Sequence, residues 1–194
     1  MRTFVAIDLH NTEKIVDIQN RIVKEHNFNV NDIRPIHKDN LHLTLKFLGE
    51  VSDDQVKEII TALQNLRFES FEARFIDIGC FPNSIDPRII WLKLDDRCIK
   101  QIDSLYHVVT KLLNSVKDIK IKQCSGADEK FEFTPHLTIF RVKHRQRFEK
   151  PLNFAHDNIS YSTEIDRIKF KKSILTSGGP IYSDLITIEA TSRT

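Results

Sequence analysis

The sequence has few of the residues that break or cross-link a chain. Only 5 of its 194 residues are glycine and 6 are proline, which argues against collagen-like, low-complexity or extensively disordered proteins. Its 3 cysteines are widely spaced and include no Cys-x-x-Cys pair, so a zinc ribbon or a redox dithiol is not expected. No apolar run is long enough to span a bilayer, and the run that follows Met1 is too short for a signal peptide. We therefore expect a cytoplasmic protein with reduced cysteines.

Neither positive nor negative charge is in large excess. The 29 Lys and Arg residues against 27 Asp and Glu give a net charge of +2, so any basic patch for nucleic acid must be local. Hydrophobic residues make up 40% and charged residues 29%, as in ordinary globular proteins. The length suits one domain spanning residues 1–194, built in two lobes, and we expect a monomer.

Apolar periodicity predicts an α+β fold with three main helices and mostly antiparallel strands. The expected helices run from about Glu13 to His26, from an N-cap at Ser52 to about Leu66, and from about Cys98 to Val116. The expected strands are Thr3 to Leu9, Ile33 to Ile36, Leu41 to Leu48, Phe71 to Ile78, Arg88 to Leu94, Phe131 to Val142, Ile165 to Ile174 and Ile181 to Ala190.

One short motif occurs twice. His42-Leu43-Thr44-Leu45 recurs as His136-Leu137-Thr138-Ile139. Two chance matches to such a pattern are expected on the order of once in ten thousand chains of this size. Residues i and i+2 of a strand share a face, so each motif presents an imidazole and a hydroxyl on one side and packs its aliphatic residues on the other. We expect Lys46 to share the face of His42 and Phe47 to share the core face.

These residue types fit the opening of a cyclic phosphate. That reaction needs a base for water and an acid for the departing sugar oxygen, and imidazole serves both roles near neutral pH. We predict that His42 and His136 are catalytic and that the hydroxyls of Thr44 and Thr138 bind the phosphate oxygens. This chemistry requires no cofactor.

Two alternatives compete with that interpretation. A single strand histidine more often has a structural role, but core packing gives no reason to repeat the His-x-Thr pair on one face. Alternatively, His37, His42, His136 and His144 offer nitrogen ligands for a metal ion. No metal-ligand spacing accompanies them, so we expect no metal.

Around these motifs the chain resembles the RNA 2′,3′-cyclic phosphodiesterase family, also called the 2′-5′ RNA ligase family, of the two-histidine (2H) phosphoesterase superfamily. The matching segments are Phe4 to Asp8, Asn40 to Glu50, Phe81 to Asn83, Pro87 to Trp91, Pro135 to Val142, Ser173 to Leu175 and Gly179 to Tyr182. The resemblance covers nearly the whole chain. The segment from Ile119 to Phe133 departs from it, being longer and more polar than the family pattern.

The resemblance implies a bilobal fold with pseudo-two-fold symmetry, in which two antiparallel sheets line a central cleft and the helices lie outside. It implies a hydrolase that opens 2′,3′-cyclic phosphate at RNA ends or on nucleotides to a 2′-phosphate during RNA processing. Some members also join or cleave 2′-5′ linkages. Arg141 matches the arginine that helps to hold the phosphate, although strict alternation would place it opposite His136.

Other functions stay open at this point. A non-catalytic RNA- or nucleotide-binding module with the same cleft is one alternative, and a phosphodiesterase for another cyclic phosphate is a second. Phe4, Phe47 and Trp91 fit packing roles better than substrate contacts, although an aromatic residue near the cleft would also suit base stacking. The basic loop from Lys143 to Lys150 is equally compatible with RNA contact and with a solvated loop.

Overall fold

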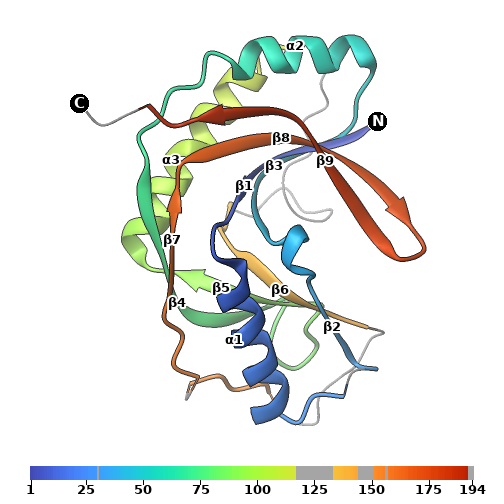
Figure 1. The fold of residues 1–194 in the computed structure, drawn as a ribbon, viewed down its shortest axis with the longest axis vertical. Helices are drawn as coiled ribbons and strands as arrows, with labels where there is room; N and C mark the ends of the chain where they lie inside the picture. The colour runs from blue at the N-terminus through green and yellow to red at the C-terminus, as the bar shows by residue number, and fades with distance from the viewer. Residues whose placement is uncertain (30, 117–132, 144–150, 156, 192–194) are drawn as a thin grey trace.

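The computed structural model describes residues 1–29, 31–116, 133–143, 151–155 and 157–191. Its strands form a curved sheet with helices on the outside (Figure 1). The strands are β1 (Arg2–Asp8), β2 (Ile33–Pro35), β3 (His42–Glu50), β4 (Phe71–Phe81), β5 (Ile89–Leu94), β6 (Leu137–Val142), β7 (Tyr161–Ile165), β8 (Arg167–Thr176) and β9 (Gly179–Glu189). The helices are α1 (Thr12–Glu25), α2 (Asp53–Leu63), α3 (Asp96–Leu113) and the short 3-10 turn η1 (Lys38–Asn40).

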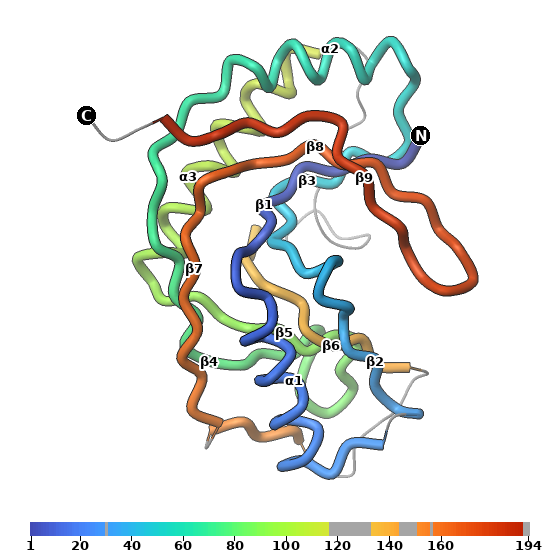
Figure 2. The backbone as a smooth tube through the Cα atoms, in the orientation of Figure 1, coloured from blue at the N-terminus to red at the C-terminus, as the bar shows by residue number. Residues whose placement is uncertain are grey.

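The sheet follows the order β7-β4-β5-β6-β3-β1-β8-β9, with β2 added beside β6. Its two halves meet where β3 pairs with β6, through the single residue pair Leu43 and Leu137. The expected α+β fold with two antiparallel halves is confirmed (Figure 2). The fold differs from the expectation in one respect. The pairing of Leu43 with Leu137 joins the two halves into one continuous sheet, where two separate sheets were expected.

The helices connect the two halves. Helix α1 follows β1 of one half and packs against β6 of the other half and against η1, whereas α3 follows β5 and packs against β3 and α2. The predicted capping box at the start of α2 is present: Ser52 accepts a hydrogen bond from the backbone of Gln55, whose side chain accepts one from the backbone of Ser52. Most buried apolar residues of the two halves form one contiguous core.

One strand, β7, is not evident in the sequence pattern. Ile165 ends β7 rather than beginning a longer strand, and β8 begins after it. In β7 the buried positions are Tyr161, Thr163 and Ile165, so the alternation is hidden unless threonine is counted as a core residue. The strand predicted from Phe131 to Val142 begins only at Leu137: residues 131–132 lie outside the described residues, and 133–136 are described but are not part of a strand.

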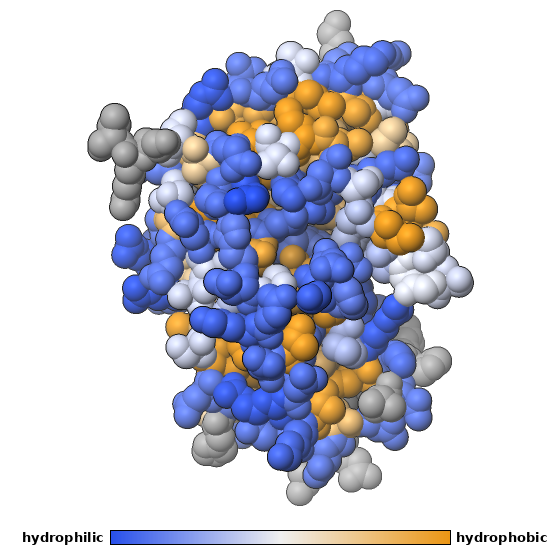
Figure 3. Space-filling model, in the orientation of Figure 1, coloured by the Kyte–Doolittle hydropathy of each residue, from blue (hydrophilic) through white to orange (hydrophobic). Residues whose placement is uncertain are grey.

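The face shown in Figure 3 is largely hydrophilic, with apolar surface over the β8–β9 hairpin. The exposed large apolar residues of this hairpin are Ile174, Leu175 and Ile181. Among the described residues, no helix is long and apolar enough to cross a membrane. The single domain, the monomeric state and the cytoplasmic location remain predictions.

Candidate active site

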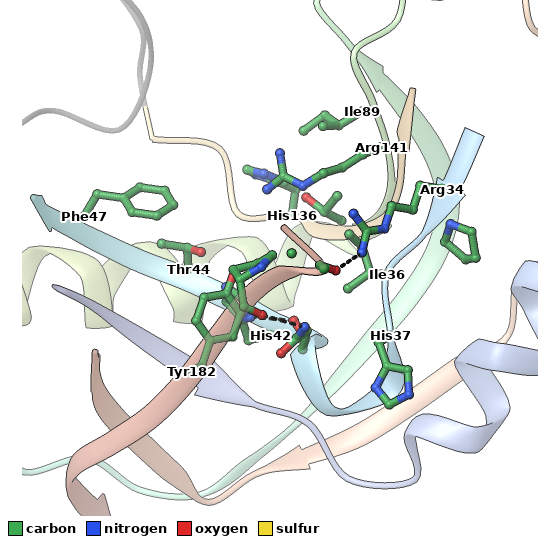
Figure 4. Close-up of a pocket in the computed structure, with 16 residues that line it drawn as sticks. Arg34, Ile36, His37, His42, Thr44, Phe47, Ile89, His136, Arg141 and Tyr182 are labelled. Atoms are coloured by element: carbon green, nitrogen blue, oxygen red, sulfur yellow. Dashed lines mark hydrogen bonds between the residues drawn. The ribbon is translucent and has the colours of Figure 1, made fainter. Parts of the chain in front are cut away.

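The two His-x-Thr motifs lie side by side in the middle of the sheet. Leu43 of the first motif pairs with Leu137 of the second in antiparallel orientation, so the histidines and threonines lie around this pair. All five residues predicted for the site line one cleft: His42, Thr44, His136, Thr138 and Arg141 (Figure 4). The cleft has a volume of about 590 Å³, which is in the range of sites for small ligands.

Backbone carbonyl groups hold both imidazole rings in the same way. The Nδ1 atom of His42 lies 2.7 Å from the carbonyl oxygen of Asn40, and Nδ1 of His136 lies 2.7 Å from that of Thr134. A carbonyl oxygen only accepts, so Nδ1 of each ring is the donor. Each Nε2 atom is therefore free to take up or release a proton in the cleft.

Aromatic side chains hold His42 in position. Its ring lies 5.1 Å from the ring of Phe4 and 5.2 Å from that of Tyr182, the latter in a perpendicular arrangement. Phe4 and Tyr182 also contact each other, with ring centroids 5.0 Å apart. This packing leaves the ring of His42 little freedom to rotate.

A second aromatic pair holds His136. Its ring lies 5.2 Å from Phe81 and 5.8 Å from Trp91, and these two rings stack at 4.9 Å. Trp91 passes directly over Gly79, where a Cβ atom would lie 2.4 Å from the indole ring. This position fits the packing role predicted for Trp91. The indole packs against His136, the histidine of the second motif.

Burial makes both imidazoles less basic. It lowers the pKa of His42 from 6.5 to about 4, while the hydrogen bond to Asn40 and the carboxylate of Asp8 act in the opposite direction. Burial also lowers the pKa of His136, partly offset by the hydrogen bond to Thr134. With both pKa values below the ordinary value, both rings are neutral near pH 7, and an anion in the cleft would favour their protonated forms.

A group of four charged side chains lies beside His42. The Nζ atom of Lys171 donates to both carboxylate oxygens of Asp8 at 2.9 and 2.7 Å and lies 2.8 Å from Asp184. Lys169 bridges the same two carboxylates at 2.9 and 2.6 Å. Asp8 pairs with His42 across β1 and β3, so the group contributes to the electrostatic environment of this histidine.

A β-bulge lies at the last residue of the first motif. Ala6 pairs with Thr44 whereas Val5 pairs with Lys46, which leaves Leu45 as an extra residue in β3. The extra residue reverses the alternation of the side chains beyond it.

The prediction for the residues beyond this bulge was therefore wrong. Phe47 is 48% exposed and lines the cleft, although strict alternation predicts a core position for it. Lys46 is only 2% exposed, and its Nζ atom donates to the hydroxyl of Tyr106 at 3.0 Å.

The second motif has the same bulge. Trp91 pairs with Thr138 whereas Ile90 pairs with Phe140, so Ile139 is the extra residue in β6. The alternation reverses here too, and the bulge accounts for the presence of the Arg141 side chain in the cleft. Strict alternation had placed it on the opposite face.

The rim of the cleft includes residues that the motifs do not reveal. Arg34 of β2 donates through Nη2 to the carbonyl oxygen of Gly178, and the side-chain amide of Asn40 donates to that of Pro180 at 3.3 Å. These bonds hold the β8–β9 turn at the cleft. Arg34 and Tyr182 are the functional candidates that sequence reasoning missed, and only the pairing of β2 with β6 and of β8 with β9 brings them to the site.

Several other residues considered from the sequence lie away from the cleft or outside the described residues. Cys98 is buried, and its thiol contacts the backbone of Glu72 at 3.4 Å. Cys124, His144 and most of the basic loop lie outside the described residues. Within the described part of the chain, no three His, Cys, Asp or Glu side chains gather as metal ligands.

Comparison with known proteins identifies the family. A model of the family described as LigT like Phosphoesterase matches residues 11–91. An Archaeoglobus fulgidus protein named RNA 2′,3′-cyclic phosphodiesterase is 34% identical over 97% of this chain and 100% of its own length. The chain belongs to the family of RNA 2′,3′-cyclic phosphodiesterases, the LigT-like phosphoesterases. The resemblance inferred from the two motifs is thereby confirmed.

Other LigT-like phosphoesterases support the same assignment. A Methanocaldococcus jannaschii RNA 2′,3′-cyclic phosphodiesterase is 32% identical over 94% of this chain and 96% of its own. The crystal structure of Escherichia coli LigT complexed with 3′-AMP superimposes with a TM-score of 0.74 at 26% identity, covering 98% of both chains. The same E. coli protein has also been crystallised with ATP.

Proposed function

We propose that this LigT-like phosphoesterase hydrolyses the 2′,3′-cyclic phosphate of RNA ends or nucleotides to a 2′-phosphate by general acid–base catalysis with His42 and His136. One observation carries the proposal: two imidazoles are held through Nδ1 by backbone carbonyls, so that both Nε2 atoms are available in a single cleft. The names of the relatives supply the reaction class.

The catalytic step balances with these two groups alone. Nε2 of His136 takes a proton from water as the water oxygen attacks phosphorus. The bond between phosphorus and the 3′ oxygen breaks, and Nε2 of His42 gives that oxygen its proton. The products are a 2′-phosphate and a free 3′-hydroxyl. A 5′-hydroxyl of RNA in place of water would form a 2′-5′ linkage by the same step.

The other cleft residues bind the phosphate in this scheme. The hydroxyls of Thr44 and Thr138 donate to the non-bridging oxygens, where negative charge is concentrated in the transition state. Arg141 adds a guanidinium that is turned into the cleft by the bulge at Ile139. This arrangement supports acid–base catalysis over mere binding, because a binding module has no need of a matched acid and base.

Family resemblance suggests the assignment of His136 as base and His42 as acid. Electrostatics alone does not assign the roles, because the Asp8 carboxylate stabilises the protonated form of His42 whereas burial, Lys171 and Arg141 act against it. A substrate with sulfur at the 3′ bridging position has a good leaving group and does not need the acid. It should rescue His42→Ala and not His136→Ala, whereas the opposite result would reverse the two roles.

The activity itself is tested by product analysis. The protein should convert a 2′,3′-cyclic nucleotide to the 2′-phosphate isomer, which phosphorus NMR distinguishes from the 3′ isomer. The same assay should include an ADP-ribose cyclic phosphate, a 2′-5′ dinucleotide and an RNA with a 5′-hydroxyl, to detect other substrates and ligation. Turnover should persist in EDTA; loss in EDTA with recovery on adding zinc or manganese would contradict catalysis by the two histidines alone.

A further inference from the structure

A second arginine faces the cleft beside Arg141. Arg34 of β2 is its direct partner in the antiparallel pairing of β2 with β6. Direct partners point to the same face of a sheet, so the two guanidinium groups share one side of the cleft. Both residues line it, and both side chains extend toward its middle in Figure 4.

This pair of positive charges has no carboxylate partner among the residues that the structure describes. Within the described part of the chain, neither Arg34 nor Arg141 forms an ion pair with a carboxylate. Like charges at directly opposite positions destabilise a pair of strands. An anion bound beside them would remove that cost and gain charge-assisted hydrogen bonds.

The guanidinium of Arg34 has a defined position. Its Nη2 atom donates to the carbonyl oxygen of Gly178. The neighbouring Gly179 has a positive φ of 121°, and a Cβ atom there would lie 2.9 Å from Nη2 of Arg34. The glycine turn thus accommodates the side chain of Arg34 and holds it by one hydrogen bond. The other N–H groups of this guanidinium remain available to a ligand.

The reacting phosphate does not require this second guanidinium. A cyclic phosphate carries one negative charge and two non-bridging oxygens, and the scheme above already gives it two hydroxyls, two imidazoles and Arg141. Arg34 belongs to β2, which pairs with β6 beyond the end of the second motif, opposite Arg141. The aromatic side chains of the cleft, Phe47 and Tyr182, come from β3 and β9 in the other half of the sheet.

We propose that Arg34 binds the phosphate on the 5′ carbon of the terminal nucleotide, so that the site selects the end of an RNA chain over a nucleoside cyclic phosphate. The ribose at such an end carries the cyclic phosphate on its 2′ and 3′ oxygens and a phosphodiester on its 5′ carbon. The second anion therefore lies one ribose away from the reacting one. This inference rests on the proposed function, because it takes the cyclic phosphate to lie between the histidines.

The test compares cytidine 2′,3′-cyclic phosphate with the same compound carrying a 5′-methyl phosphate, which has the single charge of an RNA linkage. The 5′-methyl phosphate should raise kcat/KM about tenfold or more, as expected for a charged hydrogen bond. Arg34→Gln should remove most of that advantage. Lys100→Gln removes an exposed charge from α3 outside the cleft and should leave kcat/KM for both substrates unchanged.

The outcomes separate a phosphate-binding role of Arg34 from a purely structural one. If Arg34 serves only to hold the β8–β9 turn, Arg34→Gln slows both substrates equally and the proposal is wrong. If the wild-type protein turns over both compounds equally, no 5′-phosphate subsite exists. If neither compound is turned over, the proposed function fails, and calorimetry with cytidine 2′-phosphate and cytidine 2′,5′-bisphosphate then tests the subsite. Tighter binding of the bisphosphate that is lost in Arg34→Gln supports the subsite. Equal binding of the two compounds overturns it.

Discussion

Phe47 and Arg141 occupy matching positions in the two halves of the molecule. Each lies five residues after the histidine of its motif (42 to 47 and 136 to 141), and each is turned into the cleft by a bulge at the fourth motif residue. The repeated backbone thus presents an aromatic ring from one half and a guanidinium from the other. A nucleotide has a base for the first and phosphates for the second, so the asymmetry of these two residues suits a nucleotide bound in one direction.

Removing either imidazole should abolish most activity. His42→Ala and His136→Ala should each lower kcat by roughly 10²–10⁴-fold, as for other general acid–base residues. The double mutant should lose much less than the product of the two single losses, because the pair acts as a unit. Steady-state kinetics with circular dichroism as a folding control provide the measurement. A single mutant with near-normal turnover would refute the site assignment.

The threonine hydroxyls should contribute to the rate and little to the fold. Thr44→Val and Thr138→Val keep the shape of the side chain and favour a strand. Each removes one hydrogen bond to a charged oxygen, worth roughly 1.5–3 kcal/mol. We expect kcat/KM to fall roughly tenfold or more in each, with unchanged melting temperature. Unchanged kinetics in both variants would mean that the threonines only form strand.

Phe47 should bind the base of the substrate. Phe47→Ala should weaken binding by about 1–3 kcal/mol, the usual value for one base stacked on an aromatic ring. The loss should appear in KM more than in kcat, because the base is remote from the reacting bond. Ile76→Ala is a matched control, since Ile76 is 52% exposed and lies outside the cleft. If KM values of both variants match that of the wild type, Phe47 is not a base-binding residue.

The sequence predicts the catalytic centre better than its surroundings. The repeat of His-x-Thr is local, and alternation along a strand is enough to place His42 and Thr44 on one face. The reversal at Leu45 depends on how β1 pairs with β3, which no local pattern in β3 encodes. Arg34 reaches the cleft through pairing with β6, a strand distant in the sequence, so tertiary structure alone reveals its proximity to Arg141.

The pH dependence should differ between the free protein and its substrate complex. Catalysis requires one neutral and one protonated histidine, so both profiles should be bell-shaped. Burial lowers the pKa of His42 to about 4 and also lowers that of His136. In the free protein, the form with one protonated and one neutral histidine therefore appears only as the pH falls below the ordinary pKa of histidine. The maximum of kcat/KM should therefore lie below about pH 6.5. The bound phosphate anion favours protonation, so the maximum of kcat should lie at higher pH. Coincident maxima would contradict this mechanism of pH control.

The carboxylate of Asp8 should shift that profile through His42. It favours the protonated imidazole, so Asp8→Asn should lower the pKa of His42 further and move the maximum of kcat/KM to lower pH, with reduced activity at pH 7. Asp184→Asn is the matched control. It breaks ion pairs to the same Lys169 and Lys171, but Asp184 is not among the main causes of the shifted pKa of His42. A loss of stability common to both variants, with a pH shift only in Asp8→Asn, would separate the electrostatic role from the structural one. Equal shifts in both variants would show that the charged group acts on His42 as a whole and not through Asp8.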